Sequence, residues 1–144
     1  MIEVRNLVKE FDGTMVLNNI DATFQKGVVN IIIGKSGSGK TVMLKCLVGL
    51  TPPTSGEILY DGSNLTTMRS GEVRRLRRDI GMLFQGAALF DSRTVLENVM
   101  FPLEMFSRKN RRERRKRAEF CLERVALLHA ANLLPSEISG GMKK

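Results

Sequence analysis

The chain has 144 residues, of which 42% are hydrophobic and 26% are charged, a size and composition typical of one globular domain with its own core. No segment reaches the roughly 20 apolar residues that a membrane-spanning helix requires, and the residues after Met1 lack the layout of a secretion signal. Because Cys46 and Cys121 do not have the spacing of metal ligands, we expect buried or half-buried free thiols.

The net charge of +8 comes almost entirely from one segment. Residues 108–117 hold eight basic side chains and one acid, Glu113, so this segment alone contributes +7. Two interpretations stay open for it. It can be a solvated helix start, or it can lie near anionic lipid headgroups, which attract each Lys or Arg by about 1 kcal/mol.

The first part of the chain alternates strand and turn patterns. Residues 1–11 and 15–24 predict two strands, and the pair Asp12–Gly13 between them predicts a hairpin turn. The apolar run Val28–Ile33 predicts a buried strand, and the segment Val42–Leu50 predicts a helix.

The next elements are shorter. Glu57–Tyr60 predicts a strand closed by a turn at Asp61–Gly62. Ser70–Asp79 predicts a polar, basic helix with Ser70 as its N-cap, and Ile80–Gln85 predicts another apolar strand.

From Gly86 onward the pattern is helical. Residues 95–106 carry apolar side chains at helical spacing, and residues 111–128 continue with a second helix. The second helix is predicted to place these residues on one face: Ala118, Cys121, Leu122, Val125 and Leu128.

Residues 34–41 match the phosphate-binding template G-x-x-x-x-G-K-[ST] at every fixed position, between a predicted strand and a predicted helix. Glycines allow the backbone to turn successive N–H groups toward one anion, and the helix start adds its own amides. Lys40 can reach the outer phosphates, and the Thr41 hydroxyl can bind Mg²⁺. The predicted nucleotide-binding residues are Gly34, Lys35, Ser36, Gly37, Ser38, Gly39, Lys40 and Thr41.

Three further features extend this site. Gln85 ends a predicted strand, where a glutamine can bind Mg²⁺ and position water or simply cap the strand. Residues 139–141, Ser-Gly-Gly, offer a second anion-binding concavity or an ordinary helix N-cap. Phe11, with Val16 five residues later, can stack on a purine or belong to the core.

In this order and at these separations, the features resemble the ATP-binding cassette (ABC) transporter ATPases over the whole chain. Residues 34–41 match the Walker A loop, Phe11 the adenine-stacking aromatic, Gln85 the Q-loop and residues 139–141 the signature motif. The resemblance implies an α/β P-loop NTPase (RecA-like) core with an N-terminal antiparallel β hairpin and an α-helical subdomain. It divides the chain into residues 1–85, a partial nucleotide-binding core with the antiparallel subdomain, and residues 86–144, a helical subdomain ending in the signature.

Within the family, residues 81–91 and 95–99, together with Met142, look like the ATPase of Mla-type phospholipid transporters. Met142 stands where the usual signature has glutamine, and a methionine cannot make the hydrogen bonds of that glutamine. The resemblance therefore implies an ATPase that drives phospholipid transport across the envelope.

The resemblance also implies roles and partners. Two cassettes would pack head to tail around ATP and Mg²⁺, with Lys40 on the phosphates and Thr41 and Gln85 on the metal. The signature residues Ser139, Gly140 and Gly141 would act on the neighbouring cassette's nucleotide. Residues 86–106 would receive a transmembrane permease, with a periplasmic lipid-binding protein in the same system. The location would be cytoplasmic, peripheral to the inner membrane through the permease; nucleic acid is not an expected partner.

In the family, the Walker B aspartate and the catalytic glutamate follow the signature, and this sequence ends at Lys144 before them. We therefore expect an N-terminal portion, truncated before the Walker B strand, whose residues 28–33 lose sheet neighbours. It would be an ABC-type ATPase when complete and inactive alone. Two alternatives remain: an ABC-type ATPase that contacts nucleic acid through residues 108–117, and a non-catalytic subunit that occupies a membrane partner.

Overall fold

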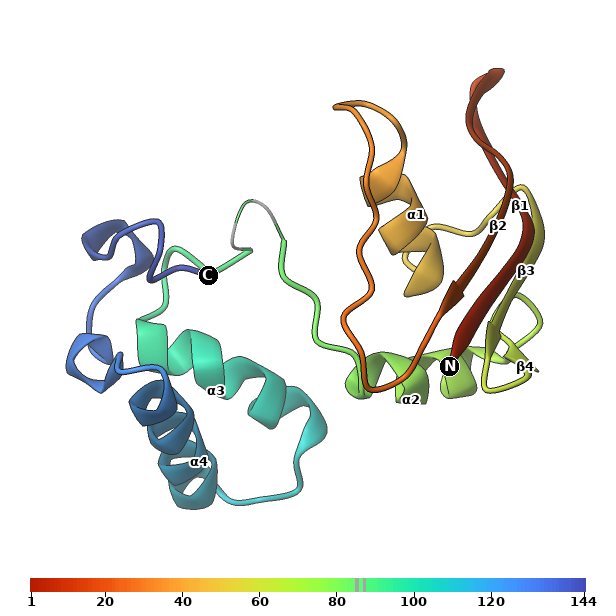
Figure 1. The fold of residues 1–144 in the computed structure, drawn as a ribbon. Coiled ribbons are helices and arrows are strands. Elements are labelled where there is room, and N and C mark those ends of the chain that lie inside the picture. The colour runs from red at the N-terminus through yellow and green to blue at the C-terminus, as the bar shows by residue number, and fades with distance from the viewer. Residues whose placement is uncertain (85, 87) are drawn as a thin grey trace. The chain divides into compact units, whose positions relative to one another are not determined.

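The computed structural model describes residues 1–84, 86 and 88–144, and these form two compact units, Met1–Gly81 and Met82–Lys144 (Figure 1). Gln85 and Ala87 lie outside the described residues. Each unit has its own cluster of buried apolar side chains, so each is described by itself.

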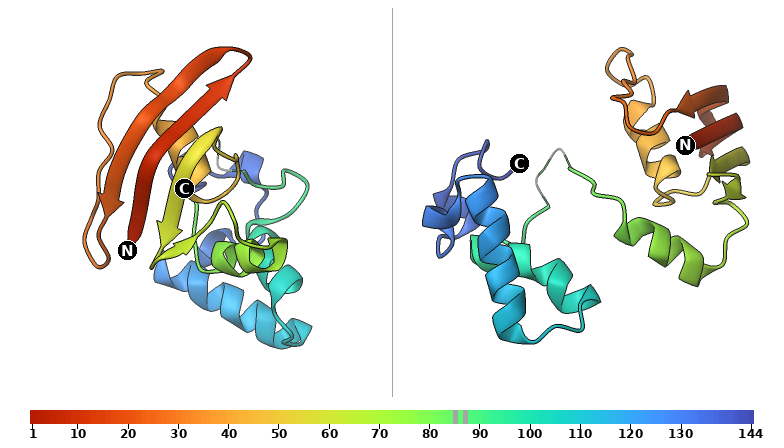
Figure 2. Two further views of the ribbon diagram at one scale, coloured as in Figure 1. Left: turned by 90° about the vertical axis from the view of Figure 1, so that its right-hand side faces the viewer. Right: turned by 60° about the horizontal axis from the view of Figure 1, so that its bottom comes forward.

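The first unit is built on a four-stranded sheet in the order β2-β1-β3-β4, in which every neighbouring pair is antiparallel (Figures 1 and 2). The predicted hairpin of the first two strands is confirmed. The two-residue strand β4 was not predicted. The strands are β1 (Ile2–Phe11), β2 (Thr14–Phe24), β3 (Ser55–Tyr60) and β4 (Ser63–Asn64).

Two Asp-Gly pairs set the strand register. Asp12 and Gly13 have φ values of 46° and 80°, and Asp61 and Gly62 have φ values of 45° and 84°. Positive φ at both central residues is what a two-residue type I′ hairpin turn requires, and Asp-Gly accepts it with little strain. The predicted turns at both positions are therefore confirmed.

Two helices complete the first unit, α1 (Lys40–Leu47) and α2 (Ser70–Arg78). Helix α1 ends earlier than predicted because Gly49, at φ 69°, donates to Cys46 O at 2.9 Å while Leu50 N–H donates to Lys45 O at 2.8 Å. This is a Schellman motif, which stops a helix at a left-handed glycine. The predicted N-cap of α2 was wrong by one residue: Arg69 is the N-cap, and its N–H donates to the Glu72 carboxylate at 2.8 Å.

Helix α1 lies against the sheet (Figure 2) and joins its buried side chains. The Cys46 thiol is completely buried there, and this burial raises its pKa, opposed in part by the charge of Lys9. The prediction of buried or half-buried free thiols is confirmed, because Cys121 is half-buried. The core of the first unit consists of Val4, Leu7, Leu17, Met43, Cys46, Leu47, Ile58 and Leu65.

Among the described residues, two predicted strands do not form. Residues 28–33 and 80–84 have no regular secondary structure, and Val29, Ile33 and Leu83 are 88%, 89% and 65% exposed. A strand is stable only when its backbone groups pair with neighbours, and no described strand pairs with either segment. The strand predictions were therefore wrong for these residues.

The described residues of the second unit form two α-helices and two short 3₁₀ turns. Helix α3 has the predicted bounds, Val95–Phe106, and its partner is α4 (Arg111–Arg124). The 3₁₀ turns are η1 (Leu128–Ala130) and η2 (Pro135–Glu137). Among the described residues, no helix has the length and apolar character needed to cross a membrane.

Helix α4 ends earlier than the apolar pattern predicted. Ala126 takes a left-handed φ of 58°, its N–H donates to Glu123 O at 3.0 Å, and Leu127 N–H donates to Leu122 O at 2.8 Å. These two bonds form a second Schellman motif. Val125 and Leu128 lie beyond the end of α4 and are 61% and 44% exposed. The prediction that they share one face of the helix was therefore wrong.

Helices α3 and α4 pack on one another through a small core, which also receives the segments after α4. Ile138 is buried in it, and Met142 packs against it. The buried residues of this core are Val95, Leu96, Met100, Ala118, Leu122, Ala130, Ala131 and Ile138.

The close contact of β3 with β1 at Gly56 can be tested by substitution. Gly56 has φ +90°, and a Cβ there would lie 2.7 Å from Arg5 O and closer still to Asn6 O. Gly56→Ala therefore combines backbone strain with a collision against the main chain of β1, and we expect a loss of at least about 3 kcal/mol in the free energy of unfolding.

Gly62→Ala is the matched control, because Gly62 has φ +84° but a Cβ there meets nothing within 4 Å. It should cost only about 1–2 kcal/mol, the strain of a left-handed alanine. Urea unfolding followed by far-UV circular dichroism measures both variants. If Gly56→Ala and Gly62→Ala lost equal unfolding free energy, the main chain of β1 would have moved to accommodate the added methyl group.

Candidate nucleotide-binding site

The loop from Gly34 to Lys40 is shaped by glycines, two of which have backbone angles that other residues rarely adopt. Gly37 and Gly39 have φ values of 79° and 87°, in the left-handed region. A Cβ on Gly39 would lie 2.9 Å from Val16 O, and a Cβ on Gly34 would collide with Ser38 Oγ. The loop is thus a bend that meets β2 at Gly39 and passes through left-handed glycines, as the phosphate-binding template requires.

The bend leads into a helix start with unused donors. Gly39 is the N-cap of α1 and no side chain caps the helix. Among the described residues, the first amide of α1 with a backbone acceptor is that of Met43, which donates to Gly39 O at 2.8 Å. The earlier amides and the positive end of the helix dipole remain available to an anion.

Lys40 places its ammonium group over this loop. Its Nζ donates to Gly34 O at 2.7 Å and to Lys35 O at 2.6 Å. An ammonium group has three donors, so one remains for a bound anion. Thr41, the next residue, is exposed, and among the described residues nothing is hydrogen-bonded to its hydroxyl. These groups fit a triphosphate with its Mg²⁺, since the donors converge and one hydroxyl oxygen is open.

The two residues predicted to contact the base belong to the same unit. Phe11 ends β1 and is 43% exposed, with the Lys9 ammonium 4.7 Å from its ring centroid. Val16 lies on β2, and its carbonyl touches the loop at Gly39. The turn after Phe11 and residues 34–39 lie at the same end of the first unit (Figure 1). Gln85, the remaining predicted Mg²⁺ ligand, lies outside the described residues.

The Ser-Gly-Gly segment lies in the second unit and starts a helical turn. Ser139 Oγ accepts the Met142 N–H at 3.3 Å, and Ser139 O accepts the Lys143 N–H at 3.2 Å. Gly140 and Gly141 are exposed, so their backbone is open to a ligand. Met142 packs against the apolar core, which gives a physical reason for an apolar side chain at this position.

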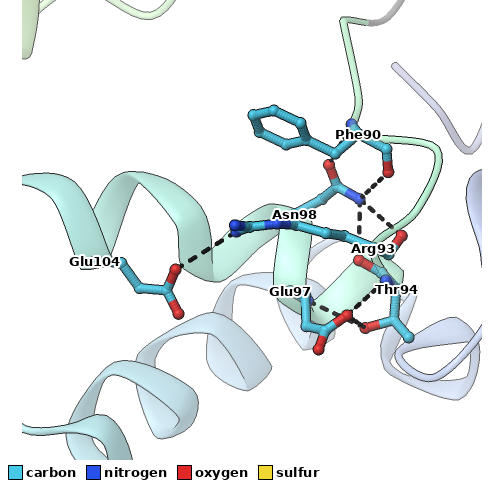
Figure 3. A network of polar contacts seen from close by, with 6 residues as sticks. All are labelled: Phe90, Arg93, Thr94, Glu97, Asn98 and Glu104. Carbon is cyan, nitrogen blue, oxygen red and sulfur yellow. Dashed lines mark hydrogen bonds and ion pairs between the residues drawn. The ribbon is translucent and has the colours of Figure 1, made fainter.

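A polar network at the start of α3 was missed by the sequence predictions (Figure 3). Asn98 Nδ2 donates to the carbonyls of Phe90, Arg93 and Thr94 at 3.0–3.1 Å, and its Oδ1 accepts the Phe90 N–H at 2.8 Å. Arg93 lies 5.1 Å from the Phe90 ring and forms an ion pair with Glu104 at 3.5 Å. One side chain therefore fastens the chain before α3 to the helix.

A signal for this helix start is present in the sequence, since Thr94-x-x-Glu97 is the capping-box pattern. The Thr94 N–H donates to Glu97 Oε2 at 2.8 Å, and Thr94 Oγ1 accepts the Glu97 N–H at 3.3 Å. The bond from the Thr94 N–H is the main cause that lowers the pKa of Glu97. No comparable sequence pattern indicates the hydrogen bonds of Asn98.

With these features in place, the comparisons with known proteins identify the family. The family model for the ABC transporter matches residues 17–144. The chain belongs to the ABC transporter family. It is 42% identical to the glutamine transport ATP-binding protein GlnQ of Escherichia coli, over all of this chain and 60% of that protein.

Other relatives are about equally similar. The chain is 40% identical to the methionine import ATP-binding protein MetN 2 of Enterococcus faecalis, over 43% of that protein. It is 38% identical to the intermembrane phospholipid transport system ATP-binding protein MlaF of Haemophilus influenzae, over 54% of that protein. Both comparisons cover the whole of this chain, so it spans about half the length of these relatives.

A solved structure shares the fold. The ATP-binding cassette MJ0796, described as a dimeric post-hydrolysis state bound to ADP and Pi, aligns with a TM-score of 0.88 and 35% identity. The alignment covers 99% of this chain and 65% of the other. The predicted fold class, a P-loop NTPase of the ABC type, is confirmed.

The Asn98 network leads to a prediction about the stability of α3. Asn98→Ala removes an amide whose two N–H donors are shared among three carbonyls and whose oxygen accepts one N–H, so about three hydrogen bonds of about 1 kcal/mol net each are lost. The carbonyls of Phe90 and Thr94 keep the backbone N–H groups of Arg93 and Asn98 as donors, whereas the part-buried Arg93 carbonyl loses this partner. We expect a loss of about 2–4 kcal/mol in the local opening free energy of α3. Hydrogen exchange of the α3 amides measures it.

Glu104→Ala is the matched control in the same network. It removes only the ion pair with Arg93, whose side chains are 39% and 42% exposed, and such pairs contribute about 0–1 kcal/mol. If the two variants lowered protection equally, Asn98 would have no special role at this helix start.

Proposed function

We propose that this chain provides the ATP-binding part of a transport ATPase. The observation that carries the proposal is the loop at residues 34–40, in which left-handed glycines, an uncapped helix start and the Lys40 ammonium converge. The loop amides and Lys40 bind and orient the phosphates, Thr41 and Gln85 hold Mg²⁺, and Phe11 with Val16 contacts the base. When bound, ATP supplies the phosphoanhydride whose hydrolysis drives transport.

The proposal includes a second cassette. The exposed backbone of Gly140 and Gly141, with Ser139 beside them, would face the nucleotide held by the neighbouring cassette. Support comes from the solved relative, which is described as dimeric and bound to ADP and Pi. Backbone dipoles aimed at the phosphates would add electrostatic stabilisation in trans.

The membrane partners belong to the proposal as well. Residues 86–106 would receive a transmembrane permease and so place the chain on the cytoplasmic side of the inner membrane. The Asn98 network supports this assignment, because it fixes the segment before α3 to the helix and a docking surface must hold its shape. A periplasmic lipid-binding protein would complete the system.

For the substrate class we propose phospholipid, supported by the 38% identity to MlaF and by residues 81–91 and 95–99 with Met142. Amino-acid importers are similarly identical, so the test must separate these classes. The permease complex is purified in detergent, and ATPase stimulation is compared for phospholipid, methionine and glutamine. We expect stimulation by phospholipid alone; stimulation by either amino acid would refute the assignment.

Hydrolysis itself requires a base to activate water. We expect the 144 residues alone to hydrolyse ATP near the background rate, and the complete protein to be an ATPase. A phosphate-release assay at saturating Mg-ATP measures this. Turnover by the 144 residues as fast as by the permease complex would contradict the expectation.

Lys40 and Lys35 provide a matched pair for nucleotide binding. Lys40→Ala removes the ammonium group that lies over the loop, and charge-assisted bonds contribute about 1.5–3 kcal/mol each, so affinity for Mg-ATP should fall by about 10-fold to 100-fold. Calorimetric titration of the chain measures this affinity.

Lys35→Ala removes an equal charge from an exposed position of the same loop. Its carbonyl, which accepts from Lys40, is retained. The affinity should change by less than about threefold, as for a screened surface charge. Equal losses in both variants would mean that the nucleotide senses only the net charge of the loop.

A further inference from the structure

The basic segment, residues 108–117, joins α3 to α4 and supplies the first turns of α4. Seven of its eight cationic side chains are exposed, and Arg114 is half-buried. None of the nucleotide-binding residues lies here, so the nucleotide site does not account for this charge. The cationic residues are Arg108, Lys109, Arg111, Arg112, Arg114, Arg115, Lys116 and Arg117.

Among the described residues, few acids offset the positive charge of this segment; Glu97 attracts Arg111. Glu113 is engaged at the helix start, where its carboxylate accepts the Asn110 N–H at 3.0 Å. In the part of the chain that the structure describes, one ion pair involves the segment, between Arg115 and Glu119 at 2.8 Å. Clustered like charges repel one another, and a polyanionic surface would relieve that repulsion.

Exposed apolar side chains flank the basic segment on both sides. Met105 near the end of α3 is 61% exposed, and Phe120 on α4 is 47% exposed. The Arg117 guanidinium lies 5.2 Å from the Phe120 ring centroid. Cationic groups beside exposed apolar side chains match a bilayer interface, where the charges meet headgroups and the apolar groups enter between them.

We propose that the basic segment, with Met105 and Phe120, is a contact surface for a bilayer that contains anionic phospholipid. Such headgroups offer a dense layer of negative phosphates. A nucleic acid would also attract the charge, but Met105 cannot stack on a base and one face of Phe120 carries Arg117. The apolar neighbours therefore favour the lipid surface.

The position of this surface is compatible with the proposed nucleotide role. Within the second unit, the connection from α3 to α4 lies at the end opposite the C-terminal segment that carries Ser139 (Figures 1 and 2). Contact with a bilayer would leave the Ser-Gly-Gly segment uncovered.

Vesicle flotation of the 144-residue chain tests the proposal, because floating vesicles separate bound protein from aggregates. Vesicles of phosphatidylcholine alone are compared with vesicles in which about one third is phosphatidylglycerol. We expect binding only to the anionic vesicles, with a steep loss as sodium chloride rises from about 0.1 M to about 0.5 M.

Arg112→Gln with Lys116→Gln removes two exposed charges while keeping helix propensity. We expect about a 30-fold fall in the vesicle partition coefficient, roughly fivefold for each basic residue. Arg112→Lys with Lys116→Arg should restore binding. Phe120→Ala should lower it by several-fold, since part of an apolar ring is withdrawn from the interface.

Arg74→Gln with Arg75→Gln is the matched control, since it removes two exposed arginines from α2. It should retain most of the binding. Equal loss in the two double variants, equal binding to both vesicle types, no effect of Phe120→Ala, or displacement by a DNA duplex at equal phosphate concentration would each overturn the proposal. Circular dichroism confirms that each variant is folded.

Discussion

The packing of α1 against the sheet is the constraint on which the nucleotide site depends. Met43, Cys46 and Leu47 anchor the helix in the core of the first unit. The backbone of Gly39 then meets the Val16 carbonyl so closely that a Cβ would lie 2.9 Å from it. The preceding loop must therefore bend through left-handed glycines, and this bend brings the Lys40 ammonium onto the carbonyls of the loop.

The same arrangement leaves the binding groups unsatisfied by the protein itself. A helix start without a side-chain cap is a cost in most proteins, since its first amides have no partner. Here the first amides of α1 adjoin a loop over which the Lys40 ammonium group lies. A bound anion would accept hydrogen bonds from these amides and balance the charge of the ammonium group, so this geometry is suited to phosphates.

The molecule exposes two different kinds of surface. Residues 28–33 present exposed apolar side chains and a backbone that belongs to no described strand, and strands of a sheet would pair with it. The basic segment instead presents clustered positive charge, and one described ion pair involves it, between Arg115 and Glu119. Residues 28–33 would bind a partner through backbone hydrogen bonds, whereas the basic segment would bind a polyanion. The two surfaces therefore suit different partners.

The sequence by itself determined the features that depend on a few neighbouring residues. These include the two Asp-Gly hairpin turns, the bounds of α3 and the glycines of the phosphate loop, because turn and loop conformation follow from local φ preferences. The resemblance to ABC ATPases rested on such local motifs, and the family and fold were correctly predicted from them. The phospholipid branch was not separated from the amino-acid importers, since short motifs report the shared nucleotide chemistry more directly than the cargo.

Only the tertiary structure decided the features that need distant partners. The apolar run 28–33 reads as a strand, but a strand exists only where another strand pairs with it. Val125 fits the apolar stripe of α4, yet the left-handed turn at Ala126 ends the helix before it. The packing of Met142 in the core and the hydrogen bonds of Asn98 likewise depend on where the chain returns in space. Burial and pairing are properties of the assembled fold, so no local pattern could settle them.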